Sequence, residues 1–437
     1  MSHNTANVPR VTSSYAFACP VARGPHPNIA HFRLMVESTP VRGSGETQRG
    51  VRQGRQAFLM WPAKRWPGHH ACEGGRAMSP QGQGIGRREF LTYAAGAAVG
   101  TAVGLRAPAG AQPPDPSTIL NHSPNMEYRR LGKTGLWVSA VCLGGHWKRL
   151  QAAEGTSGWD LPGEQAMQAL IANRTEVVSK CIDVGINYVD ACAGGEIMAY
   201  AEALRGRREK MYLGFSWYES ELRFPEWRTK AKLIEGFDNG LRQAKLDYAD
   251  VWRVSALMTE PQPEADMEAM MEAFDVLQEQ GKVRFLGLSS HHHEFLKHAI
   301  ETWPQISVIL FPYTVNSKEL PQDSLFEAVR AQDVGVFGIK PFASNSIFRG
   351  NSQLDSPVAT DDDELARLTL RYILGNAAIT APIPGLINTH QVENAALAVR
   401  ERRGLDLGEQ ARLQQAADQM AANLPPDYQW LRNWEWV

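Results

Sequence analysis

The sequence is poor in three features that define common classes of protein. Its 437 residues include only five cysteines, and no two of these form a Cys-x-x-Cys pair, so it predicts neither a disulfide framework nor a zinc ribbon. No run of 18 apolar residues occurs, and no stable membrane span is expected. The formal net charge of −2 argues against nucleic-acid binding, which needs a basic face.

The charge is unevenly distributed along the chain. Residues 1–77 contain ten Lys and Arg residues against three acidic ones, and they lack periodic apolar faces. We interpret this segment as disordered, since runs of one charge are usually solvated. A basic binding arm is the alternative.

Residues 78–111 resemble a twin-arginine (Tat) export signal. Arg87 and Arg88 precede a weakly apolar stretch over residues 91–105, and Ala109-Gly-Ala111 supplies a small-x-small cleavage pattern. A short amphipathic or buried helix is the alternative interpretation. The resemblance implies the Tat export machinery as a partner and a periplasmic or other extracytoplasmic location.

The position of this signal leads to an expectation about the start of the protein. A signal peptide stands at the beginning of its chain, so we expect Met78 to be the natural start and residues 1–77 to be an over-extended reading. The mature protein would begin near Gln112, and residues 112–125 would be a linker.

From residue 126 onward, apolar runs alternate with helical patterns. Strands are predicted at 137–143, 187–190, 211–215, 250–254, 283–288, 306–311, 334–339 and 379–382. Helices are predicted at 164–183, 196–205, 227–244, 264–280, 292–301, 320–331, 362–375, 388–399 and 408–422. This order predicts an α/β TIM (β/α)8 barrel over residues 126–437, with an N-terminal β-hairpin and C-terminal helices. A doubly wound open sheet is the alternative, although no Gly-x-Gly-x-x-Gly follows the first strand.

Several motifs in this region resemble the aldo-keto reductase superfamily. They are Tyr128–Ser139 followed by Leu143-Gly144, Gly185–Asp190, Gly281–His291, Gly338–Pro341 and Ile383–Gly385, and together they cover roughly residues 126–425. The resemblance implies a barrel that binds NADP or NAD across its strand ends. It also implies oxidation or reduction of a small-molecule carbonyl or alcohol substrate.

The catalytic set that the resemblance implies is incomplete. The family uses Asp, Tyr, Lys and His, and only the aspartate has a counterpart, Asp190. Residues 191–196 contain no tyrosine, and Tyr200 beyond them is expected to pack in a helix. Ser216 and Ser255 stand where the lysine and the histidine are expected. Three of the four catalytic roles are therefore unfilled, while the fold that the resemblance implies is unaffected.

The positions that bind the cofactor are better preserved. The resemblance assigns them to Ser289, Ser290, Lys340, Gly385, Asn388, Gln391 and Asn394. The two serines would hold the nicotinamide amide, and Lys340 a phosphate. Gly385 and the helix that starts at Asn388 would approach the diphosphate. His390 and Gln391 stand where NADP-specific members have an arginine, which leaves NADP and NAD both open.

Other chemistry-bearing residues have two interpretations each. His146 is either a substitute proton donor or a loop residue bonded to backbone. Cys192 is either a nucleophile or a small packed residue. Consecutive histidines cannot all face one ion, so we expect no metal at His291–His293. The tryptophans either stack on a substrate ring or cap the barrel; they are Trp147, Trp159, Trp217, Trp430, Trp434 and Trp436.

Three classes of function follow from the sequence. The first is an exported, aldo-keto-reductase-like NAD(P)-dependent oxidoreductase with a rearranged proton donor. The second is a barrel that keeps a ligand or cofactor pocket without turnover. The third is a barrel enzyme of unrelated chemistry, such as a sugar isomerase or hydrolase, which would need paired carboxylates or metal ligands at its strand ends.

Overall fold

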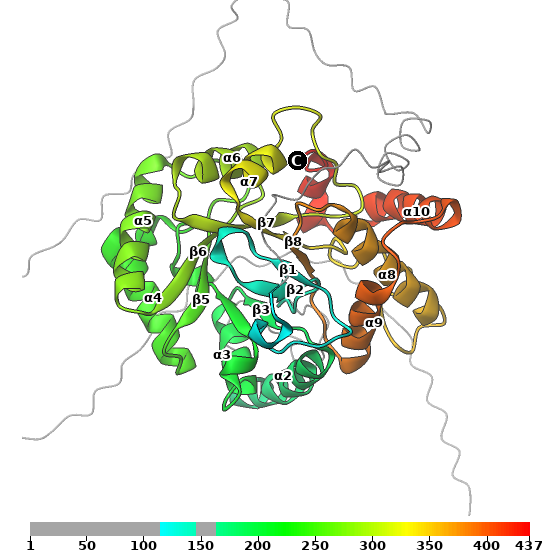
Figure 1. Ribbon diagram of the computed structural model, residues 1–437, viewed down its shortest axis with the longest axis horizontal. Coiled ribbons are helices and arrows are strands. Elements are labelled where there is room, and N and C mark those ends of the chain that lie inside the picture. The colour runs from blue at the N-terminus through cyan, green and yellow to red at the C-terminus, as the bar shows by residue number, and fades with distance from the viewer. Residues whose placement is uncertain (1–113, 146–162) are drawn as a thin grey trace, which may run out of the picture. The chain divides into compact units, whose positions relative to one another are not determined.

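The computed structural model describes residues 114–145 and 163–437 (Figure 1). Seven parallel strands form one sheet in which each strand pairs with the next in the chain. They are β3 (Tyr188–Ala191), β4 (Tyr212–Phe215), β5 (Ala249–Ser255), β6 (Val283–Ser289), β7 (Ile306–Pro312), β8 (Gly335–Ile339) and β9 (Ala381–Ile383). Sequential parallel pairing with helical crossovers is the topology of a TIM barrel. The predicted fold class is confirmed, and the open-sheet alternative is wrong.

The segment before Gly145 almost closes this sheet into a ring. Leu143 forms a parallel bridge with Val189 of β3, while the Cys142 N–H donates to the carbonyl oxygen of Pro382 in β9 at 3.1 Å. The strand predicted at 137–143 is therefore divided. Its first part, β2 (Trp137–Ser139), pairs antiparallel with β1 (Tyr128–Arg130), and only the residues after it lie between β9 and β3.

The predicted helices surround the sheet in the described residues (Figure 1). They are α2 (Glu164–Val184), α3 (Gly194–Ala203), α4 (Lys230–Ala244), α5 (Glu264–Glu279), α6 (His293–Thr302), α7 (Leu325–Gln332), α8 (Ala359–Gly375), α9 (Thr389–Arg400) and α10 (Leu407–Asn423). The largest difference is at α7, which starts five residues later than predicted. The Ser324 side chain accepts a hydrogen bond from the Glu327 N–H at 3.1 Å, and this cap sets the start of the helix.

Each barrel strand alternates between two environments. In β5, Trp252 and Val254 belong to the core between sheet and helices, whereas Val251 belongs to the apolar cluster inside the barrel. Since side chains alternate along a strand, Arg253 and Ser255 share the inward face with Val251. This alternation turns an arginine and a serine towards the barrel axis.

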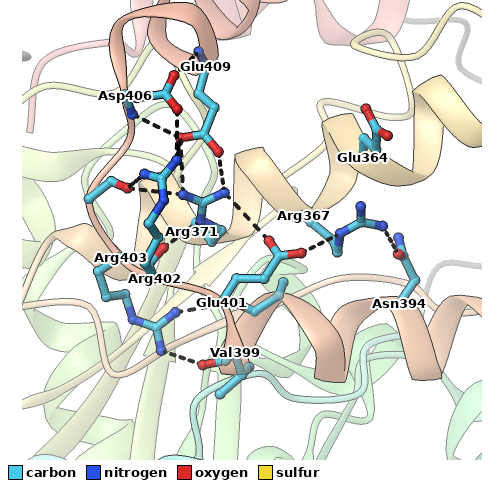
Figure 2. Close-up of polar contacts among 12 residues, drawn as sticks. Glu364, Arg367, Arg371, Asn394, Val399, Glu401, Arg402, Arg403, Asp406 and Glu409 are labelled. Carbon is cyan, nitrogen blue, oxygen red and sulfur yellow. Dashed lines mark hydrogen bonds and ion pairs between the residues drawn. The ribbon is translucent and has the colours of Figure 1, made fainter.

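An ion-pair network ties together the three helices near the C-terminus (Figure 2). Arg371 on α8 pairs with Glu409 on α10 at 2.9 Å, and Arg367 pairs with Glu401, which caps the end of α9, at 2.8 Å. Arg371 is only 4% exposed, so its pairing with carboxylates offsets the cost of burying its charge. The network fixes the position of α9, which forms one wall of the site described next.

Several predictions fall on residues that the structure does not describe. Residues 1–77, the signal at 78–111, His146, Trp147 and Trp159 all lie outside the described ranges. Within those ranges, no helix is both long enough and apolar enough to cross a membrane.

Candidate active site

A cavity of about 490 Å³ opens at the carboxyl ends of the strands. Its floor is formed by Gly144, Gly145, Asp190 and Arg253, and its walls include Lys340, Gly385 and the start of α9. Active sites of TIM barrels form at this end of the strands, because the loops there converge on the barrel axis.

Six of the eight site residues predicted from the sequence line this one cavity. They are Asp190, Lys340, Gly385, Asn388, Gln391 and Asn394. Ser289 and Ser290 are buried at the end of β6 but are not part of the lining. The Ser290 hydroxyl donates to the Leu257 carbonyl oxygen at 2.7 Å and accepts from the His292 N–H at 3.2 Å, so it organises the strand end.

Asp190 and Arg253 form a buried ion pair on the floor. Arg253 Nε lies 3.2 Å from Asp190 Oδ2, and both side chains are at most 6% exposed. Arg253 Nη1 also donates to Cys192 Sγ at 2.8 Å and to Ser255 Oγ at 3.2 Å. The floor of the cavity therefore contains a guanidinium, fixed by hydrogen bonds, next to the Asp190 carboxylate.

Two glycines on the neighbouring strands make room for this pair. Gly287 is the register partner of Arg253 in β6, and a Cβ atom there would lie 2.9 Å from Val251 Cγ1 and 3.5 Å from the Arg253 Cα. A Cβ atom on Gly214 would lie 2.8 Å from Asp190 Oδ1. A side chain at Gly214 would meet the Asp190 carboxylate, and one at Gly287 would meet Val251 beneath Arg253. Glycine is therefore required at both positions by space rather than by backbone conformation.

Glu221 lies behind the floor and organises two serines, Ser216 and Ser255. Its Oε2 accepts from Ser216 Oγ and from the Ser255 N–H, both at 2.7 Å. Burial raises the pKa of Glu221 to about 6, although these hydrogen bonds and Arg253 oppose the rise. Ser216 and Ser255 are themselves buried and do not line the cavity.

Cys192 and Tyr200 occupy buried positions around the floor. Cys192 Sγ accepts the hydrogen bond from Arg253, and burial raises the pKa of its thiol, which disfavours the thiolate needed for a nucleophile. The Tyr200 hydroxyl donates to the carbonyl oxygen of Gly144 at 2.7 Å. Tyr200 thus supports the cavity floor from behind, in agreement with the packing interpretation.

The three consecutive histidines point to three different partners. His291 stacks on Trp430 with ring centroids 4.2 Å apart, His292 caps α6, and His293 Nδ1 lies 2.8 Å from the Trp436 carbonyl oxygen. Within the described residues, no cluster of three or more His, Cys, Asp or Glu side chains could hold a metal ion.

The tryptophans of the described residues contact protein groups. Trp217 is 6% exposed and packs on Phe215 in the core. Trp436 lies against Lys318, whose Nζ is 5.1 Å from the ring centroid, and Trp434 lies beside His293. None of these side chains belongs to the cavity lining, so their contacts fit the capping interpretation.

The far end of the cavity, beyond Lys340, carries polar and acidic groups. Asn388 caps α9 by accepting from the Gln391 N–H at 2.8 Å, and Asn394 accepts from Arg367 Nη1 at 2.6 Å (Figure 2). The carboxylates of Asp355 and Asp363 share this part of the lining. Asp363 also pairs with His390 at 2.6 Å.

Arg253, Glu221 and Asp363 are the site residues that sequence reasoning missed. A signal existed for Arg253, because it falls on the inward face of an alternating strand, two residues before Ser255. No comparable local pattern marks Glu221, which lies in the loop after β4, or Asp363, the fifth residue of α8.

Residues 155–417, more than half of the sequence, match the profile of the aldo/keto reductase family. The chain belongs to that family.

Among curated relatives, it is 26% identical to the aldo-keto reductase YhdN of Bacillus subtilis over 46% of this chain and 57% of that protein. It therefore spans less than two thirds of the length of YhdN. It is 22% identical to the L-galactose dehydrogenase of Arabidopsis thaliana over 65% of this chain and 92% of that protein.

Two solved structures show the same kind of distant likeness. An aldo/keto reductase from Klebsiella pneumoniae, in complex with NADP and acetate, is 20% identical over 69% of this chain and 96% of that chain, with a TM-score of 0.49. The holo form of the aldo-keto reductase AKR11C1 from Bacillus halodurans is 20% identical over 67% of this chain and 96% of that chain, with a TM-score of 0.48.

Proposed function

We propose that this chain is an NAD(P)-dependent oxidoreductase that interconverts a carbonyl and an alcohol in a small-molecule substrate. The observation that carries the proposal is the single cavity that brings together Asp190, Lys340, Gly385 and the start of α9. These groups come from β3, from the segments that follow β8 and β9, and from α9. A cavity continuous from the barrel floor to a helix N-terminus suits an extended ligand with a charged middle.

The donors along the cavity fit a dinucleotide. Lys340 supplies a cation, and the N-terminus of α9 supplies backbone N–H groups and a positive dipole end, as a diphosphate requires. When bound, the nicotinamide exchanges a hydride with the substrate. With the diphosphate near Lys340 and the reacting ring at the floor, the adenosine would lie beside Asn388, Gln391 and Asn394.

The acidic lining of the adenosine end favours NAD over NADP. A carboxylate such as Asp363 can accept a hydrogen bond from a ribose 2′-hydroxyl but repels a 2′-phosphate. Arg367, a basic residue beside Asn394, is already paired with Glu401 (Figure 2). We therefore propose NAD as the preferred cofactor.

The catalytic set differs from that of the family. The four described residues on the cavity floor include no tyrosine, lysine or histidine. A positioned general acid contributes roughly 10²–10⁴-fold to such a reaction, so simple aldehydes should be reduced slowly. The same observation favours a second candidate, a barrel that binds the cofactor without turnover.

The test follows cofactor binding and turnover separately. Nicotinamide fluorescence on titrating NADH or NADPH into the full chain should report binding, and Lys340→Met should weaken it by about 10-fold, the loss of one charged contact. Lys232→Met, on the outer helix α4, is the matched control. No fluorescence change at any concentration would overturn the oxidoreductase proposal.

Turnover then separates the two candidates. Absorbance at the nicotinamide band is followed with a panel of aldehydes and ketones. Slow but saturable reduction supports the enzyme, and binding with no turnover of any carbonyl supports the cofactor-binding barrel.

We also propose that the protein is exported through the Tat machinery. The support is the Arg87-Arg88 pair with its weakly apolar segment and Ala-Gly-Ala site. Export of a prefolded chain suits a protein that loads its cofactor before it crosses the membrane.

A further inference from the structure

Arg253 is held in a defined orientation on the cavity floor. Asp190 lies at its Nε, and Cys192 and Ser255 both accept from its Nη1, at distances of 2.8–3.2 Å. These contacts set the plane of the guanidinium before any ligand arrives. An arginine fixed in this way offers its donors with geometric selectivity, which a lysine ammonium does not.

The burial of the charged Arg253 side chain at the cavity floor is energetically costly. Burying a guanidinium beside a single carboxylate costs more than filling the same space with an apolar side chain. Burial lowers the pKa of Arg253, but the nearby negative groups, Asp190 first among them, raise it above its ordinary value. The side chain therefore stays charged at any physiological pH, in a low-dielectric site where it attracts an anionic oxygen strongly.

We propose that Arg253 binds the substrate oxygen on which negative charge develops and stabilises that charge in place of the side chains that the family uses. The inference rests on the proposed function and names a catalytic residue for it. In reduction, the carbonyl carbon would gain a hydride, with its electron pair, from the reduced nicotinamide cofactor of the proposed function, and the C–O π pair would move onto the oxygen. Arg253 holds the resulting alkoxide, and water supplies the proton that completes the alcohol. Arg253 keeps its own protons throughout.

Glu221 is a positioning residue in this arrangement. It accepts from the Ser255 N–H and from Ser216 Oγ, and Ser255 Oγ in turn contacts Arg253. Ser216 Oγ and Ser255 Oγ lie 3.3 Å apart, so the two serines form a bridge between the buried carboxylate and the guanidinium. Glu221 thus fixes the arginine through other groups and does not reach the cavity.

The test measures charge recognition without turnover. Benzoate carries a negative oxygen like that of the alkoxide, and benzamide is its neutral isostere. Calorimetric titration of the full chain should show benzoate binding about 10-fold more tightly than benzamide, the equivalent of one charge-assisted hydrogen bond. The preference should persist from pH 6 to pH 9, because Arg253 stays charged over that interval. A preference that depended on a histidine would be lost as the imidazole became neutral.

Variants assign the preference to its residue. Arg253→Gln should abolish it. Arg253→Lys should reduce it, because the three donors of an ammonium would be taken up by Asp190, Cys192 and Ser255, whereas the five donors of a guanidinium leave some for benzoate. Asp190→Asn should instead strengthen benzoate binding by removing a competing anion, a change that general damage to the site would not produce. Lys340→Met, which removes the other cation of the cavity lining, should leave the preference in place.

Several outcomes would overturn the proposal. In the first, the wild-type protein binds benzamide as tightly as benzoate; in the second, Arg253→Gln keeps the preference for benzoate; in the third, only Lys340→Met loses it. Each of these results contradicts the proposed role of Arg253. Circular dichroism shows whether Arg253→Gln folds. If it does not, the benzoate preferences of Arg253→Lys and Asp190→Asn test the role of Arg253 instead. Failure of NADH and NADPH to bind would contradict the proposed function and leave the benzoate result standing.

Discussion

The Gln391 side-chain amide donates to both the hydroxyl oxygen and the carbonyl oxygen of Ser352, at 3.2 and 3.3 Å. This contact joins α9 to the loop between β8 and α8, and both elements line the cavity. The same loop is held from α8, where the buried Asp362 carboxylate accepts from the N–H groups of Arg349, Gly350 and Ser352 at 2.9–3.0 Å. The cavity wall is thus positioned by one side chain from each flanking helix.

Removal of the Asp362 carboxylate should release this wall. Hydrogen bonds to a charged group contribute about 1.5–3 kcal/mol, so Asp362→Asn should lower the free energy of unfolding by an amount of that order. Limited proteolysis should cut residues 340–358 faster, and NADH affinity should fall several-fold. Glu364→Gln is the control, since Glu364 lies two residues later on α8 and pairs with Arg412 of α10 instead of with the loop. Equal cleavage rates in the two variants would contradict this role for Asp362.

The acidic adenosine end leads to a prediction about cofactor choice. We expect the wild-type protein to bind NADH more tightly than NADPH, and Asp363→Asn to narrow the difference by about 10-fold as repulsion of the 2′-phosphate is removed. Fluorescence titration of both cofactors measures the ratio. Glu364→Gln, next in the same helix and paired with Arg412, should leave the ratio unchanged. If the wild-type protein binds NADPH more tightly than NADH, Asp363 does not discriminate against the 2′-phosphate.

His293 should make the protein sensitive to mild acid. Burial lowers the pKa of His293 to about 4. Its Nδ1 bonds the Trp436 carbonyl oxygen, while its buried Nε2 has no hydrogen-bond partner in the described residues. Because the folded pKa lies below the ordinary value near 6.5, the contribution to stability is present above pH 6.5 and is lost as pH falls towards 4. The loss should reach about 3 kcal/mol.

The measurement is the melting temperature between pH 7.5 and pH 4. His293→Asn removes the titrating group, so its melting temperature should fall less over this interval than that of the wild-type protein. His298→Asn changes an exposed histidine on the same helix and should behave like the wild type. Parallel curves for all three proteins would show that His293 does not set the acid sensitivity.

The twin-arginine pair provides a prediction about location. Replacing Arg87 and Arg88 by lysines should leave the folded protein inside the cell, because the Tat machinery reads the paired arginines of the signal. Cell fractionation with an antibody to the barrel measures the distribution. A double variant exported as efficiently as the wild type would contradict the proposed route.

Local patterns along the chain were enough to predict the elements of the barrel. The capping box of Asp406 and Glu409 starts α10, and apolar periodicity marks the remaining helices within a few residues. The hairpin was also expected, but its second strand was predicted too long. Residues 137–139 and 142–144 both have the sequence pattern of a strand. They differ only in their partners, because residues 137–139 pair with β1 and residues 142–144 contact β9 and β3.

The sequence by itself determined the fold class, because strands and helices are visible as local patterns, and it determined the family resemblance, which pointed to six residues of the cavity. Only the tertiary structure decided that Arg253 meets Asp190, which lies 63 residues earlier and on a strand that is not its neighbour in the sheet. It also decided that Asp363 of α8 faces the same cavity as Asn394 of α9. Closing the sheet into a ring brings these side chains together, and no pattern confined to one segment of the chain contains that geometry.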